Sequence, residues 1–211
     1  MQLFLRGSEF TLLPEKALYK HDESLLIIAD IHLGKASHFR KSGIPIPANA
    51  QAADYLALER LFEKVQPKQV YFLGDLFHST FNGDWHYFAA LISRFEQIDF
   101  TLIKGNHDLI NEALFRELNI TVIDKIIEDA TFIYSHAPMS DTDGKVNISG
   151  HIHPGIRLSG QARQSLTIPC YYFINNIFLL PAFGVLTGLY IMDWDNGADI
   201  YAVLSNEVRK I

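Results

Sequence analysis

The stretch VYFLGDLFH, residues 70–78, joins an apolar run to a polar turn. Residues 70–73 are β-branched, aromatic or aliphatic, and such a short apolar run favours a strand buried on both faces. Gly74 allows a sharp turn because it has no Cβ atom, and Asp75 and His78 follow it with side chains that bind metal ions in many proteins. The stretch therefore predicts a buried strand whose carboxyl end carries functional groups.

The same combination of an apolar run and a polar turn occurs four more times along the chain. The turns are Asp30-Ile31-His32, Gly105-Asn106-His107-Asp108, Tyr134-Ser135-His136 and Ser149-Gly150-His151-Ile152-His153. Ligands collect at the carboxyl ends of the strands in open α/β sheets, so these turns are expected to meet in one crevice. A lone histidine at a strand end is more often structural, but six of the nine histidines fall in this pattern. We therefore interpret the turns jointly as a metal site.

Helical and strand patterns alternate in the first half of the chain, and strand patterns prevail in the second half. Helices are expected at 49–65, 84–95 and 110–118. Strands are expected at 24–29, 70–73, 100–103, 120–123, 131–135, 145–149, 170–174, 177–180, 189–193 and 199–204. No repeat or linker divides the sequence, so we predict a single domain over residues 1–211. The predicted fold is α/β (α+β), a four-layer αββα sandwich of two packed mixed β-sheets flanked by helices.

The composition excludes several classes of protein. With 211 residues, 48% hydrophobic and 20% charged, the chain is neither disordered nor collagenous nor a coiled coil. Its net charge of −6 is opposite to that of proteins that coat nucleic acid, so contact with DNA or RNA would be local. Cys170 is the single cysteine, and the sequence shows neither a signal peptide nor a spanning segment. We expect a cytoplasmic protein without membrane contact.

The types of candidate ligand restrict the choice of metal. The candidates are the histidines, aspartates and asparagine of the five turns. Imidazole, carboxylate and amide groups without thiolates suit manganese, iron, zinc or nickel rather than calcium or a structural zinc ion. Seven ligands are too many for one ion and suit two ions that share a carboxylate. The expected cofactor is a pair of divalent ions, with Mn²⁺ as the first choice.

As an ordered set, these motifs resemble the signature of the calcineurin-like metallophosphoesterase superfamily. The resemblance spans residues 30–153 and implies a two-sheet sandwich flanked by helices, with a dinuclear centre at the strand ends. It also implies how the ligands are shared between the ions. One metal would be held by Asp30, His32 and His153, the other by Asn106, His136 and His151, with Asp75 as the bridge.

Further stretches are similar to the bacterial DNA-ligase-associated metallophosphoesterases of the PdeM type. These stretches are residues 14–18, 29–35, 43–47 and 180–188. The similarity implies a phosphodiesterase or nuclease in DNA repair, with a DNA ligase and a helicase as partners. Residues 74–78 also resemble the SbcD-type repair nucleases, which grip DNA with an extra capping domain. This chain is too short to contain such a domain, which argues against a DNA grip of that kind.

The expected mechanism is two-metal hydrolysis of a phosphate ester. A hydroxide bridging the metals would attack phosphorus in line with the departing alkoxide. His107 lies beside Asn106 but does not match a ligand position, so it is the expected proton donor to the leaving group, with Asp108 orienting it. His78 has two open roles, which are contact with a substrate phosphate and support of the turn.

The segment 35–41 follows the first metal motif, and we read it as a loop. It contains the candidate substrate-binding residues Lys35, His38, Arg40 and Lys41. One interpretation is a solvated helix face, and the other is a binding edge for the rest of a phosphodiester.

The leading functional interpretation is a phosphodiesterase that acts on DNA, RNA or a nucleotide diester. A phosphomonoesterase acting on nucleotides or phosphoproteins would use the same ligands, so the sequence leaves that alternative open. A non-catalytic scaffold is disfavoured because every expected ligand and His107 are present. The aromatic residues 171–173 are a candidate subunit contact, which would make the protein a homo-oligomer.

Overall fold

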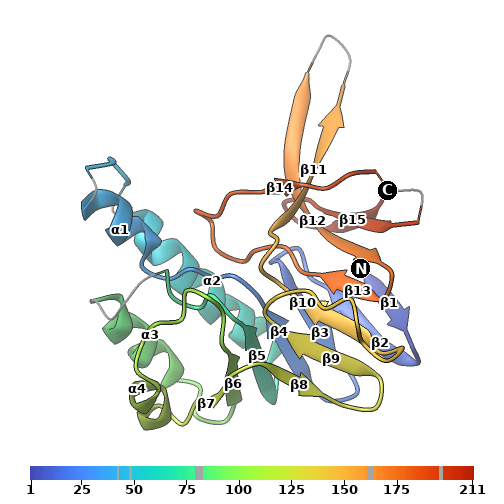
Figure 1. Ribbon diagram of the computed structural model, residues 1–211. Helices are drawn as coiled ribbons and strands as arrows, with labels where there is room; N and C mark the ends of the chain where they lie inside the picture. Colours follow the sequence, from blue (N-terminus) through green and yellow to red (C-terminus); the bar gives the residue numbers. More distant parts are fainter. Residues whose placement is uncertain (42, 48, 79–82, 161–163, 195–196) are drawn as a thin grey trace.

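The fold is built from two β-sheets and a layer of helices (Figure 1). The computed structural model describes residues 1–41, 43–47, 49–78, 83–160, 164–194 and 197–211. No helix in these ranges is both long enough and apolar enough to span a membrane.

The first sheet has its strands in sequence order. They are β1 (Gln2–Leu5), β2 (Ser8–Leu12), β3 (Ala17–Lys20), β4 (Leu25–Ile28), β5 (Gln69–Leu73), β6 (Asp99–Ile103) and β7 (Thr121–Ile123). The pairs from β1 to β4 are antiparallel, and those from β4 to β7 are parallel. The carboxyl ends of β4, β5 and β6 therefore lie at one edge. These three strands and β7 confirm the predicted ones, whereas β1 to β3 were not predicted.

Helices cover one face of this sheet. They are α2 (Asn49–Val65), α3 (Asp84–Ile92) and α4 (Glu112–Glu117), whereas α1 (Lys35–Lys41) lies against α2. The bounds of α2 are those predicted, because Leu58, Leu61 and Phe62 form a continuous buried stripe. Helix α3 ends three residues earlier than predicted, at a turn that begins with Ser93. Residues 35–41 form α1 instead of the expected loop.

The second sheet is mixed and contains most of the second half of the chain. Its strands are β8 (Ile126–Glu128), β9 (Phe132–Ser135), β10 (Val146–Ser149), β11 (Pro154–Ser159), β12 (Ser165–Ile174), β13 (Ile177–Leu179), β14 (Tyr190–Ile191), β15 (Asp199–Val203) and β16 (Val208–Lys210). Their order is β14-β11-β12-β13-β10-β9-β8, with β15 beside β12 and β16 beside β15. Strands β9, β10 and β13 are parallel, so the turns after β9 and β10 also share an edge.

The two sheets pack face to face through one large apolar core. Leu25 and Ile27 of β4 enter this core from the first sheet, and Phe132 and Ile148 enter it from the second. A separate core lies between the first sheet and helices α2, α3 and α4. The predicted pair of packed mixed sheets is thus confirmed, with helices on the outer face of the first sheet.

The outermost layer on the second sheet differs from the predicted one. Helices α2, α3 and α4 pack on the first sheet, and no described residue after Glu117 is in an α-helix. None of the described helices therefore covers the second sheet. Its outer face, which includes Ile156, Cys170 and Ile200, is contacted instead by side chains of irregular segments, among them Met192 and Ala198. The predicted fourth layer is therefore irregular chain rather than helix.

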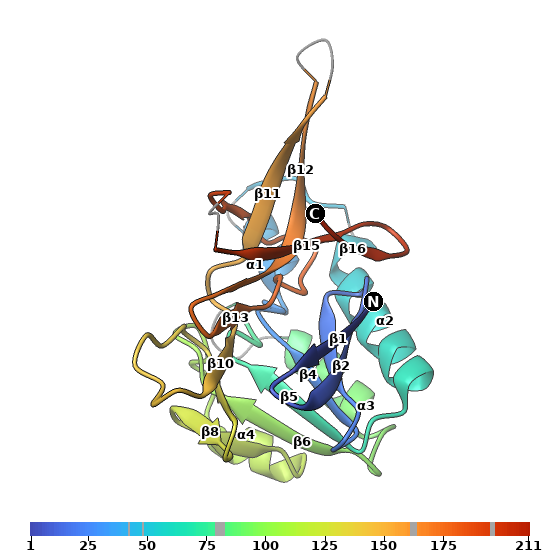
Figure 2. The same cartoon turned by 90° about the vertical axis from the view of Figure 1, so that its right-hand side faces the viewer.

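Strands β11 and β12 form a hairpin that projects from the body of the molecule in both views (Figures 1 and 2). Their antiparallel register runs from Gly155 opposite Pro169 to Ser159 opposite Ser165. The inner part of β12 is buried: Tyr171 is 0% exposed, and its hydroxyl donates hydrogen bonds to the carbonyls of Leu13 and Ala17. The expectation that residues 171–173 form a subunit contact is wrong for Tyr171 and Tyr172, because both belong to the protein's own cores.

Candidate metal centre

Five turns converge at the edge where the two sheets meet. From the first sheet come the turns after β4, β5 and β6, and from the second those after β9 and β10. Backbone hydrogen bonds tie the turns together: the N–H of Asp30 donates to the carbonyl of Gly74, and the N–H of His32 to that of Asp75. The turn after β10 is joined to the one after β9 by a bond from the N–H of Gly150 to the carbonyl of His136. The five turns therefore meet at one place, as expected.

The first group of candidate ligands is Asp30, His32 and His153, whose donor atoms lie within 4.8 Å of one another. The two histidine Nε2 atoms are 3.4 Å apart, and His153 Nε2 is 3.5 Å from Asp30 Oδ1. Asp30 and His32 are buried, at 0% and 4% exposure. The group matches the set that the family resemblance implied for one metal.

The second group contains Asp75, His136 and His151. His136 Nδ1 lies 2.9 Å from the carbonyl of Leu73, which can only accept, so Nδ1 donates in this contact. Its Nε2 is 3.0 Å from both Asn106 Oδ1 and His151 Nδ1. Asn106 thus lies with the second group, as expected.

Asp75 reaches both groups with different oxygens of its carboxylate. Its Oδ2 is 3.6 Å from His32 Nε2, and its Oδ1 is 3.5 Å from His136 Nε2. This is the position that a bridging ligand requires.

The donor atoms fit a pair of bound cations. Atoms that bind one ion at about 2.1 Å and at right angles lie roughly 3 Å apart, close to the separations within each group. Asp30 Oδ1 is buried without a hydrogen-bond partner, and His136 Nε2 lies 3.0 Å from the Asn106 oxygen and 3.5 Å from an Asp75 oxygen, so donor atoms of the second group also converge. Burial, together with neighbouring cationic groups, lowers the pKa of His32 to about 2, so the imidazole is neutral and able to bind metal at pH 7.

Glycines and strained backbone allow the turns to come this close. A Cβ atom on Gly74, Gly105 or Gly150 would lie within 3.0 Å of His136, Asp75 or Asp30, respectively. Non-glycine ligands also adopt left-handed backbone, with φ of 53° at Asp30, 52° at His32, 50° at Asp75, 69° at His151 and 56° at His153. Such values are uncommon for residues with a side chain and gather at functional sites.

Three further histidines lie beside the first group. The His107 ring packs edge-to-face on His32 at 5.4 Å and parallel to His78 at 5.5 Å, and His38 packs on His78 at 5.0 Å. Burial, with Lys35, His38 and His107 nearby, lowers the pKa of His78 to about 4. Its Nδ1 is buried and has no hydrogen-bond partner. The structure thus brings His78, His107 and His38 together.

Asp108 has a different role from the predicted one. Its Oδ1 accepts hydrogen bonds from the backbone N–H groups of Leu76 and Phe77, and its Oδ2 accepts one from Gly105. Both oxygens are therefore engaged with backbone, and the expectation that Asp108 orients the His107 ring is wrong. Asp108 instead joins the turns that carry Asp75 and Asn106. Burial raises its pKa, although these hydrogen bonds oppose the rise.

Helix α1 places Lys35 close to Asp75 and His78. Burial lowers the pKa of Lys35, and the charge of the nearby Asp75 opposes that shift. Arg40 donates a hydrogen bond to Ser37 at 3.4 Å. The side chain of Lys41 lies outside the part of the chain that the structure describes. The predicted binding segment is therefore helical and adjoins His38 and His78.

Two residues that support the centre were not predicted. Lys16 donates to the carbonyl of Phe183, and Asp54 accepts from the N–H of Val185 at 3.0 Å. The same loop donates from the N–H of Gly184 to the carbonyl of Asp30. Burial lowers the pKa of Lys16 to about 8, against the effect of Asp54. A signal was present: Asp54 lies four residues before Leu58, on the apolar face of the predicted helix.

The fold and this arrangement of ligands define a class of protein. The chain belongs to the calcineurin-like phosphoesterase family, whose sequence pattern matches residues 24–181. It is similar to the solved structure of the Pseudomonas putida nuclease MPE, with 25% sequence identity and a TM-score of 0.81 over 100% of this chain and 99% of that chain. No curated protein matches the sequence significantly. The predicted family is thus confirmed, and the protein is a metal-dependent phosphoric ester hydrolase.

Proposed function

We propose that this protein is a dinuclear metal-dependent phosphodiesterase that hydrolyses nucleic acid or nucleotide diesters. The main support is the position of the Asp75 carboxylate, which has one oxygen near each of the two donor groups. The similarity to the Pseudomonas putida nuclease MPE over the whole chain supports a phosphodiester as substrate.

The proposed ligands are Asp30, His32 and His153 for one ion, and Asn106, His136 and His151 for the other, with Asp75 shared. The mixture of imidazole, carboxylate and amide favours Mn²⁺, with iron, zinc and nickel as alternatives. Two such ions supply an activated water nucleophile and neutralise charge on the phosphoryl oxygens.

The remaining side chains in the crevice would act on the substrate. His107 is the proposed donor of a proton to the leaving group, and its backbone N–H is held by Asp75 Oδ1 at 2.9 Å. His78 is proposed to contact a phosphate oxygen, because its ring lies between His38 and His107. Lys35, Arg40 and Lys41 would attract the neighbouring phosphates of a longer substrate.

The cellular setting is part of the proposal. We propose a cytoplasmic role in DNA repair beside a DNA ligase and a helicase, on the basis of the resemblance to the PdeM-type enzymes. The chain would act as one domain over residues 1–211, and self-association would use surfaces other than the buried Tyr171 and Tyr172.

The test compares a diester with a monoester. Metal-free protein is reloaded with Mn²⁺ and assayed on bis-p-nitrophenyl phosphate and on p-nitrophenyl phosphate, with Asp75→Asn as the blank. Faster hydrolysis of the diester by the wild type is expected, and DNA and RNA strands are tested next. Preference for the monoester would contradict the proposal and direct attention to nucleotides and phosphoproteins.

A further inference from the structure

A groove on the second sheet opens beside the candidate metal centre. Its volume is about 550 Å³, within the range of pockets that bind small molecules. Its lining includes Pro138, His151, Ile152, Ile177 and Tyr190. Since His151 is also one of the second group of candidate ligands, the groove and the metal centre share a wall.

The groove is built on the same turns that present the metal ligands. Pro138 lies two residues after His136, and Ile152 lies between His151 and His153. The backbone N–H of Tyr190 donates to the carbonyl of His153 at 2.9 Å. The groove wall and the ligands are therefore fixed relative to one another.

The lining is apolar and aromatic. None of the described residues that line the groove is Lys, Arg, Asp or Glu, and the ring of Tyr190 is 64% exposed. Such a surface suits a flat, uncharged group and is unsuited to a phosphate.

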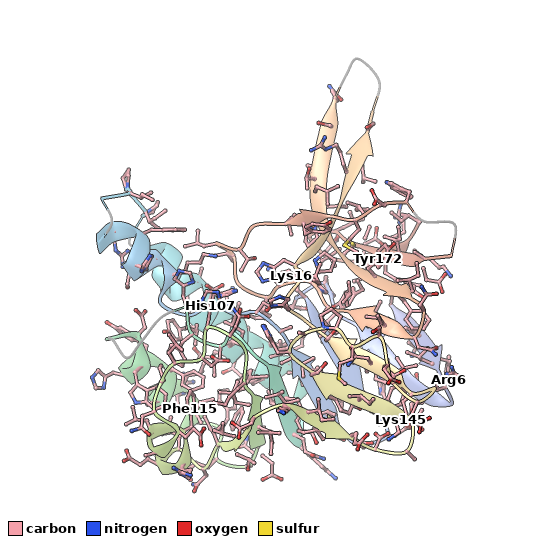
Figure 3. The ribbon with its side chains drawn as sticks, in the orientation of Figure 1. Arg6, Lys16, His107, Phe115, Lys145 and Tyr172 are labelled. Carbon is pink, nitrogen blue, oxygen red and sulfur yellow. The ribbon has the colours of Figure 1, made fainter. Side chains whose placement is uncertain are left out.

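The two sides of the metal centre differ in charge. Lys35 and His38 of α1 lie beside His78, next to the first group of ligands, whereas the apolar groove adjoins His151 of the second group. In Figure 3, His107 lies on the side of the helices, and Tyr172, another lining residue, lies on the side of the second sheet.

We propose that this groove is a nucleobase subsite, in which the base next to the cleaved phosphate stacks on Tyr190. This inference rests on the proposed phosphodiesterase function. A nucleotide diester carries its flat uncharged ring one sugar away from phosphorus, which is the arrangement that a groove sharing His151 with the metal centre accommodates. Aromatic side chains stack on the flat face of any base. The subsite therefore favours nucleotides that carry a base over abasic ones, without preference for a particular sequence.

The test uses two single-stranded decamers in Mn²⁺, one of thymidine and one in which every base is absent. The measured quantity is the ratio of kcat/KM for the normal strand to that for the abasic strand. The variants are Tyr190→Ala, Tyr190→Phe and the matched control Tyr87→Ala, since Tyr87 is 63% exposed on helix α3. Two bound metals per chain are verified for each protein.

The wild type is expected to cleave the thymidine strand more efficiently. Tyr190→Ala lowers the ratio by at least about fivefold, whereas Tyr190→Phe and Tyr87→Ala keep it. An unchanged ratio in Tyr190→Ala would overturn the inference. Equal kcat/KM values of the wild type on the thymidine and abasic strands would also overturn it, and would mean that the groove binds something else, such as a peptide or a second copy of the chain. If the wild type hydrolyses bis-p-nitrophenyl phosphate faster than the monoester in either case, the proposed function stands; if it hydrolyses no diester, both are wrong.

Discussion

The backbone N–H of His107 donates a hydrogen bond of 2.9 Å to Asp75 Oδ1, so the candidate bridging ligand also fixes the candidate proton donor. The same oxygen lies 3.5 Å from His136 Nε2. The position of His107 is therefore set through its backbone as well as by the packing of its ring on His32 and His78. A change at Asp75 is expected to disturb both metal binding and proton transfer, whereas a change at the His107 side chain is expected to disturb proton transfer alone.

Removal of one charge from Asp75 is expected to affect both metals. In Asp75→Asn the side chain keeps its size but loses the second anionic oxygen that a shared ligand needs. We expect loss of at least one of the two metals and a rate on bis-p-nitrophenyl phosphate at least about 100-fold lower. Metal analysis of the dialysed protein and steady-state rates measure both effects. Two tightly bound metals in the variant would contradict the assignment of Asp75 as the bridge.

Truncation of His107 is expected to reduce rate without removing metal. His107→Ala keeps the backbone N–H that Asp75 accepts from. Loss of general acid assistance lowers kcat by about 10²–10⁴-fold, and the loss is smaller on substrates whose leaving group needs no proton. Rates on p-nitrophenyl and alkyl esters are compared, alongside metal content. A variant that loses metal would show that His107 is a ligand.

Substitution of Asp108 is expected to weaken the fold. Asp108→Asn leaves one oxygen where two accept from Leu76, Phe77 and Gly105. The free energy of unfolding of the metal-free protein should fall by about 1–3 kcal/mol, because buried N–H groups lose an acceptor. Urea unfolding measures this change, with the exposed Asp141→Asn as the control. Equal stability of the two variants would contradict the role described for Asp108.

Charge reversal on α1 is expected to act on long substrates. The double variant Arg40→Glu, Lys41→Glu should raise KM for an oligonucleotide by about tenfold or more, because phosphates beyond the cleaved one lose their counter-charges. The KM for bis-p-nitrophenyl phosphate should change far less, since this small diester has one phosphate. Similar changes in both KM values would show that the segment does not bind the extended substrate.

Acid is expected to destabilise the metal-free protein. The pKa values of His32 and His78 in the folded state are about 2 and about 4, below the ordinary 6.5. Between the folded pKa of each histidine and 6.5, the unfolded chain binds more protons than the folded one. The stabilisation is therefore complete above pH 6.5 and is lost on acidification, down to about pH 4 for His78 and about pH 2 for His32. Thermal unfolding in chelator from pH 7.5 to 5 tests this. In His78→Gln the melting temperature should fall less per pH unit than in the wild type, and an identical fall would contradict the lowered pKa of His78.

Much of the fold could be predicted because the responsible residues repeat a local pattern. The helix at 49–65 and the central strands of the first sheet follow from apolar spacing, which decides burial directly. The hairpin at 154–174 could be predicted only at its inner end. Most of its described outer residues, among them Arg157, Ser165, Leu166 and Thr167, are exposed, so no alternating burial pattern marks them.

The candidate site was predictable in its ligands but not in its supports. Asp30, Asp75 and the histidines stand at strand ends, where topology gathers them. The role of Asp108 could not be predicted because its partners are backbone N–H groups of a distant turn. Tyr190 gave no signal either, because its neighbour His153 lies far away in sequence and meets it only through the pairing of β14.

The left-handed backbone at Asp30, His32, Asp75, His151 and His153 has an evolutionary consequence. Each such residue destabilises the fold by about 1 kcal/mol or more relative to relaxed backbone. Under selection for folding alone, substitutions that relax these conformations would be favoured, because they remove strain. A descendant that no longer used the centre is therefore expected to relax these five turns and gain stability.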